Sequence, residues 1–146
     1  MPVERPAGSE IRWEYRLNTL VNRAMDQDSL PAILALYHLQ KERPIFGAVP
    51  GVELRREGEN DVAAEFDFVF VRESKVCAGE CKAGREISEK DIRAAKLAAE
   101  LGIVEYFFCT PQSFSSEAHG AIGSLARELS GHMAVTPLES KALLGC

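Results

Sequence analysis

Apolar residues recur along the first part of the chain at helical spacing. From residue 10 to residue 25 the intervals are three and four, with arginines on the opposite side, which predicts an amphipathic helix. Asp28 or Ser29 then looks like a helix cap, with Pro31 in the first turn, so a second helix is expected to reach about Gln40. The apolar positions of the first helix are Ile11, Trp13, Leu17, Leu20, Val21, Ala24 and Met25.

The spacing then changes to that of strands. Prolines and glycines in residues 44–51 break the helical pattern, and residues 52–56 predict a short strand. Residues 62–72 and 75–82 are both rich in strand formers and are separated only by "ES". Two such runs joined by a short turn predict an antiparallel hairpin.

A further helix is predicted directly after the hairpin. Ser88 and Asp91 have the three-residue spacing of a capping box, alanine and leucine fill the following turns, and Gly102 is a plausible end of the helix. The apolar run at residues 103–110 has the length of a strand buried on both faces.

The last part of the chain repeats this alternation. Residues 115–129 predict a helix that stops before Gly131, and residues 132–138 predict a last strand. The order of elements is therefore α, β, β, β, α, β, α, β, which is typical of an α/β sandwich around a mixed sheet. We expect residues 1–146 to form a single domain, which could be one domain of a longer protein.

Charged residues interrupt the apolar hairpin on one face. Because side chains alternate along a strand, Glu80 and Lys82 share a face while Cys81 points the other way. Antiparallel pairing can bring Asp67 close to Glu80, and Glu65 lies on the same face as Asp67. The opposite face of the first strand is expected to carry Phe66, Phe68 and Phe70.

Two neighbouring carboxylates repel each other, so one takes up a proton or both hold a cation. Carboxylate and carbonyl oxygens are the ligands that Mg²⁺ and Mn²⁺ prefer. Such an ion can activate a water and neutralise a phosphate, and a nearby lysine can orient that water or stabilise the transition state. The face that carries Asp67, Glu80 and Lys82 therefore suits metal-assisted hydrolysis of a phosphodiester.

The series Asp67, hairpin, Glu80-Cys81-Lys82 resembles the D…(D/E)xK signature of the PD-(D/E)xK nuclease superfamily. The stretch "WEYRLNTLV" is similar to the context in which the first helix of that superfamily often carries a glutamate, and it places Glu14 there. The proline that gives the motif its name is missing, because Phe66 precedes Asp67. The resemblance implies a restriction endonuclease-like three-layer sandwich, with a central mixed sheet and an αβββαβ core flanked by helices.

The resemblance also implies roles for individual residues. Asp67 and Glu80 would ligate Mg²⁺ or Mn²⁺ with help from the Cys81 backbone carbonyl, Lys82 would be the catalytic lysine, and Glu14 would be a further ligand. Candidates for a supporting or substrate-binding role are Glu65, Arg85 and Lys96. The implied activity is hydrolysis of nucleic acid, DNA rather than RNA, in defence or repair.

Charge and cysteine content bear on the partners of the protein and on its cellular compartment. The net charge of -5 argues against a domain that holds nucleic acid by a broad basic surface, so DNA affinity would come from a homodimer or from an additional DNA-binding domain or protein. The four cysteines form no CxxC pair and indicate reduced core residues. No apolar run suggests a signal core or a membrane span, so we expect a cytoplasmic protein.

Two other interpretations remain open on sequence alone. The chain could be a catalytically inactive domain of the same fold that acts as a binding or scaffolding module. Alternatively, it could be an unrelated α/β protein in which the (D/E)xK triplet occurs by chance.

Overall fold

The computed structural model of the protein describes residues 29–144. The helix predicted over residues 10–25, with Glu14, lies outside the described residues. The elements are α2 (Ser29–Glu42), β1 (Gly47–Arg55), β2 (Val62–Arg72), β3 (Lys75–Cys81), α3 (Glu89–Glu100), β4 (Glu105–Cys109), α4 (Ser116–Glu128), β5 (Ala134–Leu138) and α5 (Ser140–Leu144).

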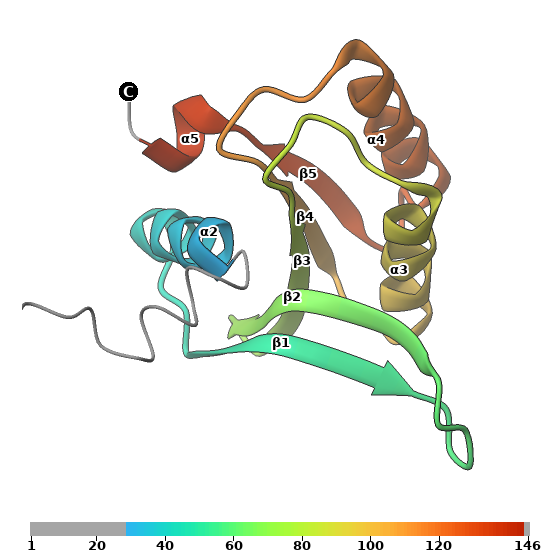
Figure 1. Ribbon diagram of the computed structural model, residues 1–146. Coiled ribbons are helices and arrows are strands. Elements are labelled where there is room, and N and C mark those ends of the chain that lie inside the picture. Colours follow the sequence, from blue (N-terminus) through green and yellow to red (C-terminus); the bar gives the residue numbers. More distant parts are fainter. Residues whose placement is uncertain (1–28, 145–146) are drawn as a thin grey trace, which may run out of the picture.

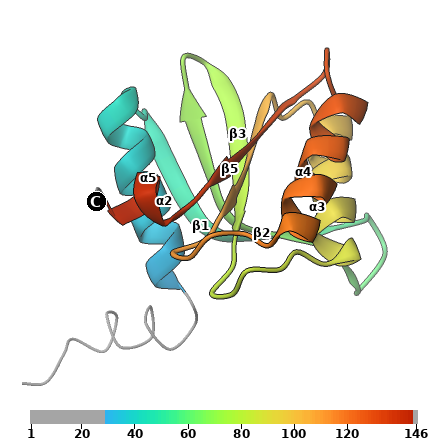
Figure 2. The same cartoon turned by 90° about the horizontal axis from the view of Figure 1, so that it is seen from above.

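The strands form one five-stranded sheet in the order β1-β2-β3-β4-β5. The pairs β1–β2 and β2–β3 are antiparallel, whereas β3–β4 and β4–β5 are parallel, so the sheet is mixed as predicted. Figures 1 and 2 show α2 and α5 on one side of the sheet and α3 and α4 on the other. The described residues therefore form three layers, helix, sheet and helix.

Each helical layer covers its own apolar cluster on the sheet. Under α3 and α4, small and aliphatic side chains of the helices pack on Tyr106 and Phe108 of β4. Under α2, Ala32, Ala35 and Leu39 pack with Phe107 and other residues of the opposite face. Successive residues of β4 thus supply the two clusters in turn, which explains why this strand is apolar throughout.

The β2–β3 hairpin forms as predicted, with a two-residue turn. Glu73 and Ser74 have φ values of 52° and 61°. Positive φ at both central positions is the feature of a type I′ turn, whose twist matches that of the strands it joins. Neither residue is the glycine or asparagine that would signal this turn most strongly in a sequence.

The first strand is longer than predicted, because it includes Gly47, Pro50 and Gly51, which we expected to lie between the helix and the strand. β1 begins at Gly47, and Pro50 pairs with Phe68 of β2. β1 lies at the edge of the sheet, where a residue without an N–H group is tolerated. Gly51 has φ +60°, a backbone conformation that glycine adopts without strain.

The prediction that Phe66, Phe68 and Phe70 share one face is wrong. The ring of Phe66 packs edge-on against Tyr106, whereas that of Phe70 packs against Phe107, on the other face of β4. The ladder between β2 and β3 ends at the pair Phe68–Gly79. Beyond this pair β2 is paired with β1 alone, and Phe66 belongs to the cluster under α3 and α4 whereas Phe68 and Phe70 belong to the cluster under α2.

The helices after the hairpin begin where the caps predict. The Ser88 side chain accepts a hydrogen bond from the Asp91 amide, and the Asp91 side chain accepts one from the Ser88 amide, which completes the capping box. Ser115 caps α4. The short helix α5 was not predicted, and β4 is shorter than the expected residues 103–110. No helix in residues 29–144 is long and apolar enough to cross a membrane.

Candidate functional site

The candidate site lies where β2 and β3 part. The Oδ2 atom of Asp67 accepts a hydrogen bond from the backbone N–H of Cys81 at 2.6 Å. The next amide, that of Lys82, donates to the carbonyl of Cys109 in β4. Because successive amides of a strand point to opposite sides, the amide and the carbonyl of Cys81 both point toward β2. The Asp67 carboxylate therefore takes the hydrogen bond that a backbone carbonyl of β2 would accept in a continuous ladder.

Lys82 joins two carboxylates from different elements. Its Nζ atom lies 2.7 Å from Oε1 of Glu80 in β3 and 2.8 Å from Oδ1 of Asp91 in α3. Glu80 and Lys82 lie on the same face of the strand end, and Cys81 packs into the cluster on the other face. Side-chain exposure is low for all three members of this ion-pair network, at 13% for Glu80, 26% for Lys82 and 6% for Asp91.

These side chains line one small hollow between the sheet and the start of α3. Its volume is about 180 Å³. The lining residues are Glu65, Asp67, Glu80, Lys82, Ser88, Lys90 and Asp91. The hollow thus combines four carboxylates with two ammonium groups, and it leaves space for a hydrated ion or part of a ligand.

Burial dominates the titration of the two strand carboxylates. It raises the pKa of Glu80 to about 7, against the hydrogen bond from Lys82, and the negative charge of Asp67 raises it further. Burial also raises the pKa of Asp67, although the hydrogen bond from the Cys81 amide opposes that shift. The two groups therefore resist being ionised together, as expected for neighbouring carboxylates.

Lys82 and Asp91 form an ion pair that stays charged at neutral pH. Burial alone would lower the pKa of Lys82, but its hydrogen bonds to Asp91 and Glu80 outweigh this effect and raise it. Burial alone would raise the pKa of Asp91, but hydrogen bonds from Lys82 and Ser88 lower it overall. Lys82 and Asp91 therefore stay charged, and the proton that the network can lose near neutrality belongs to Glu80.

A buried tyrosine lies beneath this cluster. Tyr106 is fully buried, and its hydroxyl has no hydrogen-bond partner among the described residues. Burial raises the pKa of Tyr106, and the nearby negative charges of Glu80, Asp91 and Asp67 raise it further. The tyrosine thus stays neutral and can act only as a neutral hydroxyl.

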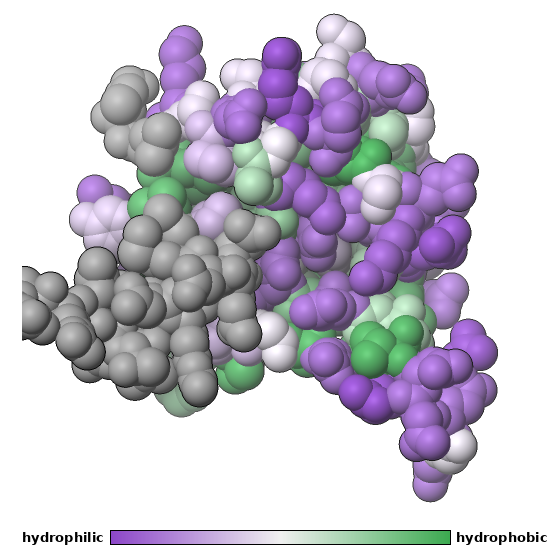
Figure 3. All heavy atoms as spheres, viewed as in Figure 1, coloured by the Kyte–Doolittle hydropathy of each residue, from purple (hydrophilic) through white to green (hydrophobic). Residues whose placement is uncertain are grey.

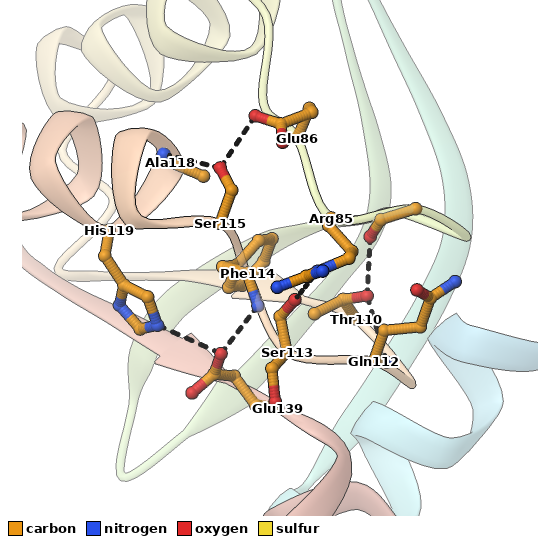
Figure 4. A network of polar contacts seen from close by, with 11 residues as sticks. Arg85, Glu86, Thr110, Gln112, Ser113, Phe114, Ser115, Ala118, His119 and Glu139 are labelled. Atoms are coloured by element: carbon orange, nitrogen blue, oxygen red, sulfur yellow. Dashed lines mark hydrogen bonds and ion pairs between the residues drawn. The ribbon is translucent and has the colours of Figure 1, made fainter.

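The loop that follows Lys82 is tied to the loop between β4 and α4 (Figure 4). The Thr110 hydroxyl donates to the Gly84 carbonyl at 2.7 Å, and the Arg85 side chain donates to the Ser113 carbonyl at 2.9 Å. The Ser115 hydroxyl donates to Glu86 at 2.8 Å. These bonds fix the path of the chain between Lys82 and the start of α3, and thereby help to hold Lys82 and Asp91 together.

The predicted residues are not all brought to the hollow. Asp67, Glu80, Lys82 and Glu65 line it. Arg85 instead forms part of the loop network. Lys96 pairs with Glu128 of α4 at 2.7 Å and lies outside the hollow. Glu14 lies outside the described residues.

The sequence does not reveal directly that Asp91 contacts Lys82. The capping-box spacing predicts only a helix cap for Asp91, yet its second oxygen contacts Lys82. The signal in the sequence was indirect, because a capping box directly after the triplet places a carboxylate close to the strand end that carries the lysine. Only the path of the loop decides whether that carboxylate turns toward the lysine.

The donor set fits a hard divalent cation in part. Among residues 29–144, no three His, Cys, Asp or Glu side chains come together in a way that could hold a metal ion. Asp67 and Glu80 nevertheless line one hollow, and we expect the Cys81 carbonyl to point to the same side as the Asp67 carboxylate. Two carboxylates, one carbonyl and several waters suit Mg²⁺, which keeps part of its hydration shell.

Comparisons with known proteins support the fold but not a family. No protein-family model matches the chain, and no curated protein does. The fold is similar to the crystal structure of protein VC1899 from Vibrio cholerae, with a TM-score of 0.57 and 18% identity over 87% of this chain and 33% of that one. It is also similar to the protein of unknown function AF1548, with a TM-score of 0.46 and 19% identity over 71% of this chain and 55% of that one. The chain therefore spans about a third of VC1899 and about half of AF1548.

Proposed function

We propose that this protein is a metal-dependent nuclease with a restriction endonuclease-like domain, and that the hollow beside Lys82 is its active site. The observation that carries the proposal is the meeting of Asp67, Glu80 and Lys82 around one hollow of about 180 Å³. The order of elements and the mixed sheet agree with the expected αβββαβ core. We propose DNA rather than RNA as the substrate.

In this proposal the ion would be held by Asp67, Glu80 and the Cys81 carbonyl. When bound, Mg²⁺ or Mn²⁺ would neutralise negative charge on the phosphate and lower the pKa of a water. The residues of the chain prepare the site for this. The Cys81 amide orients Asp67. Burial favours the protonated form of Glu80, and Glu80 would give up that proton on binding a cation.

Lys82 would supply the positive charge on the phosphate side of the site. Its raised pKa keeps it protonated at neutral pH, so it would act as a hydrogen-bond donor and not as a base. An ammonium in a partly buried hollow can stabilise the additional negative charge of a pentacovalent phosphorus, or orient the attacking water.

The surroundings of the hollow suit a polar ligand without forming a broad basic surface. In the face shown in Figure 3, hydrophilic residues predominate over α3, α4 and the tip of the β1–β2 hairpin. Given the net charge of -5, we propose that a second copy or a further DNA-binding part supplies most of the affinity for DNA.

A cleavage assay tests the proposal. Plasmid DNA, single-stranded DNA and RNA are incubated with the protein and Mg²⁺, Mn²⁺ or EDTA, and the variants K82A, E80Q and D67N are compared with K75A. Lys75 is an exposed lysine at the start of the same strand. We expect cleavage that EDTA abolishes, that K75A retains, and that each site variant lowers by about 100-fold or more.

Two results would decide against the active site. Cleavage that survives K82A and E80Q would come from another part of the protein or from a contaminant. No cleavage of any substrate, together with binding of nucleic acid, would favour the alternative in which the domain is an inactive binding module.

A further inference from the structure

Lys82 lies within hydrogen-bond distance of two carboxylates at once, Glu80 at 2.7 Å and Asp91 at 2.8 Å. We propose that Asp91 is a positioning residue that keeps Lys82 in place when a divalent cation binds to Glu80. This inference rests on the proposed function, because it assumes that Glu80 is a ligand of the cation.

Glu80 cannot serve both cations equally. Its Oε1 atom already accepts from the Lys82 ammonium. A divalent ion on the same carboxylate lies close to the ammonium, and two positive charges a few Å apart in a partly buried site repel each other strongly. The ammonium then needs another anion, or it moves out toward the solvent and is lost to the site.

Asp91 is built to be that anion. Its side chain is only 6% exposed, and its Oδ2 atom accepts hydrogen bonds from the amide of Ser88 at 2.7 Å and from its hydroxyl at 2.8 Å. These two bonds orient the carboxylate, so that Oδ1 is directed to Lys82. The capping box of α3 thus holds the carboxylate that the lysine needs.

The other charged residues of the hollow are less suited to this role. Glu65 is exposed and has no hydrogen bond to Lys82 within the described part of the chain, and Lys90 is itself a cation. Asp67 is occupied by the Cys81 amide and would be a ligand of the ion itself. Asp91 is therefore the carboxylate that can hold the lysine without belonging to the cation.

The test measures Mn²⁺ binding by electron paramagnetic resonance and calorimetry, with no substrate present. The wild type is compared with D91N, K82M and the double variant, and D91N keeps an oxygen that can accept from the Ser88 amide. We expect D91N to weaken Mn²⁺ binding about tenfold and K82M to strengthen it, since the repelling ammonium is gone. In the K82M background, D91N should change the affinity by no more than about threefold.

Three further variants separate positioning from simpler effects. D91E keeps both the charge and the cap, and should restore the affinity. E65Q removes another carboxylate of the hollow and should have the same effect with or without Lys82. S88A removes the capping hydroxyl but leaves both partners of Lys82, and should weaken Mn²⁺ binding less than D91N does.

The outcomes are distinct. If the wild type does not bind Mn²⁺, the cation site of the proposed function is wrong and the role of Asp91 falls with it. If the wild type binds Mn²⁺ but D91N has the same effect with and without Lys82, Asp91 is not a positioning residue and the proposed function stands. An S88A effect as large as that of D91N that persists in the K82M background would reduce Asp91 to a helix cap.

Discussion

The carboxylate of Asp67 in β2 accepts a hydrogen bond from the amide of Cys81 in β3 at 2.6 Å. This bond lies just beyond the last ladder pair of the two strands, Phe68–Gly79. A side chain thus replaces the backbone at the point where the strands separate. The same bond satisfies a buried amide and fixes the orientation of a carboxylate in the hollow.

This relationship predicts losses of different size for two substitutions of Asp67. D67A leaves the Cys81 amide without its partner, and should lower the free energy of unfolding by about 1 to 3 kcal/mol. D67N keeps an acceptor and removes a charge that burial disfavours, so it should cost less than about 1 kcal/mol. Urea unfolding at pH 7 checks both values. Equal losses would mean that the hydrogen bond does not support the fold.

Glu80 should make the stability depend on pH. Its pKa is about 7 in the folded protein against an ordinary value of 4.5. The stability that this raised pKa contributes is therefore fully present below pH 4.5 and is lost as the pH rises through 7. E80Q carries no such proton, so the wild type should lose on the order of 2 to 3 kcal/mol relative to E80Q between pH 4.5 and pH 8. Urea titrations at several pH values test this, and a constant difference would contradict it.

Cation binding should release a proton from the same group. At pH 6 Glu80 is largely protonated, because its pKa is about 7, and a carboxylate must be ionised to ligate a metal. Calorimetric titration with Mn²⁺ in two buffers of different ionisation enthalpy should show release of close to one proton at pH 6 and almost none at pH 8.5. Release that is the same at both pH values would mean that the ion binds elsewhere.

Gly79, directly before Glu80, should not accept a side chain. A Cβ atom there would lie 2.2 Å from Cζ of Phe68 and 2.8 Å from the carbonyl oxygen of Phe107. Since Phe68 is fully buried and the carbonyl belongs to the sheet, neither can move away easily. G79A should therefore cost about 2 to 3 kcal/mol in urea unfolding. G84A is the control, because a Cβ atom at Gly84 meets nothing within 4 Å.

An ion pair with a buried arginine, away from the hollow, should contribute more to the free energy of unfolding than an exposed ion pair. Arg72 is 3% exposed and pairs with Glu105, whereas Glu73 is 61% exposed and lies 3.7 Å from Arg43. E105Q leaves a buried guanidinium without its charged partner, and should cost about 3 kcal/mol. E73Q should change the stability by less than about 0.5 kcal/mol. Thermal unfolding of the two variants gives this comparison directly. Equal effects would mean that the Arg72–Glu105 pair stabilises the fold no more than the exposed pair does.

Local sequence signals predicted most of the elements. Ser88 and Asp91 marked the start of α3 because a cap acts through bonds between near neighbours. The hairpin was predicted from strand propensity and a short turn, although its turn residues, Glu73 and Ser74, are unusual for positive φ. In these cases the information lies within a few residues of the element.

The sequence-based predictions fail where contacts between residues far apart in the chain determine the structure. Pro50 and Gly51 indicate a break when read alone, and only the edge position of β1 allows them inside a strand. Phe66 packs in a different cluster from Phe68 and Phe70 although its register with β1 is regular, which no alternation pattern reveals. The contact between Asp91 and Lys82 depends on the path of the loop between them, and that path is held by Thr110 and other residues of a later loop.

The hollow draws all its described side chains from one stretch of the chain, residues 65–91. Hairpin closure and helix growth are fast because both bring together residues that are near in sequence. The charged cluster should therefore assemble early in folding, before the parallel pairing of β4 and β5 closes the sheet. The carboxylates would then come together while the protein is still partly open to water, and the cost of burying them would fall on the later steps of folding.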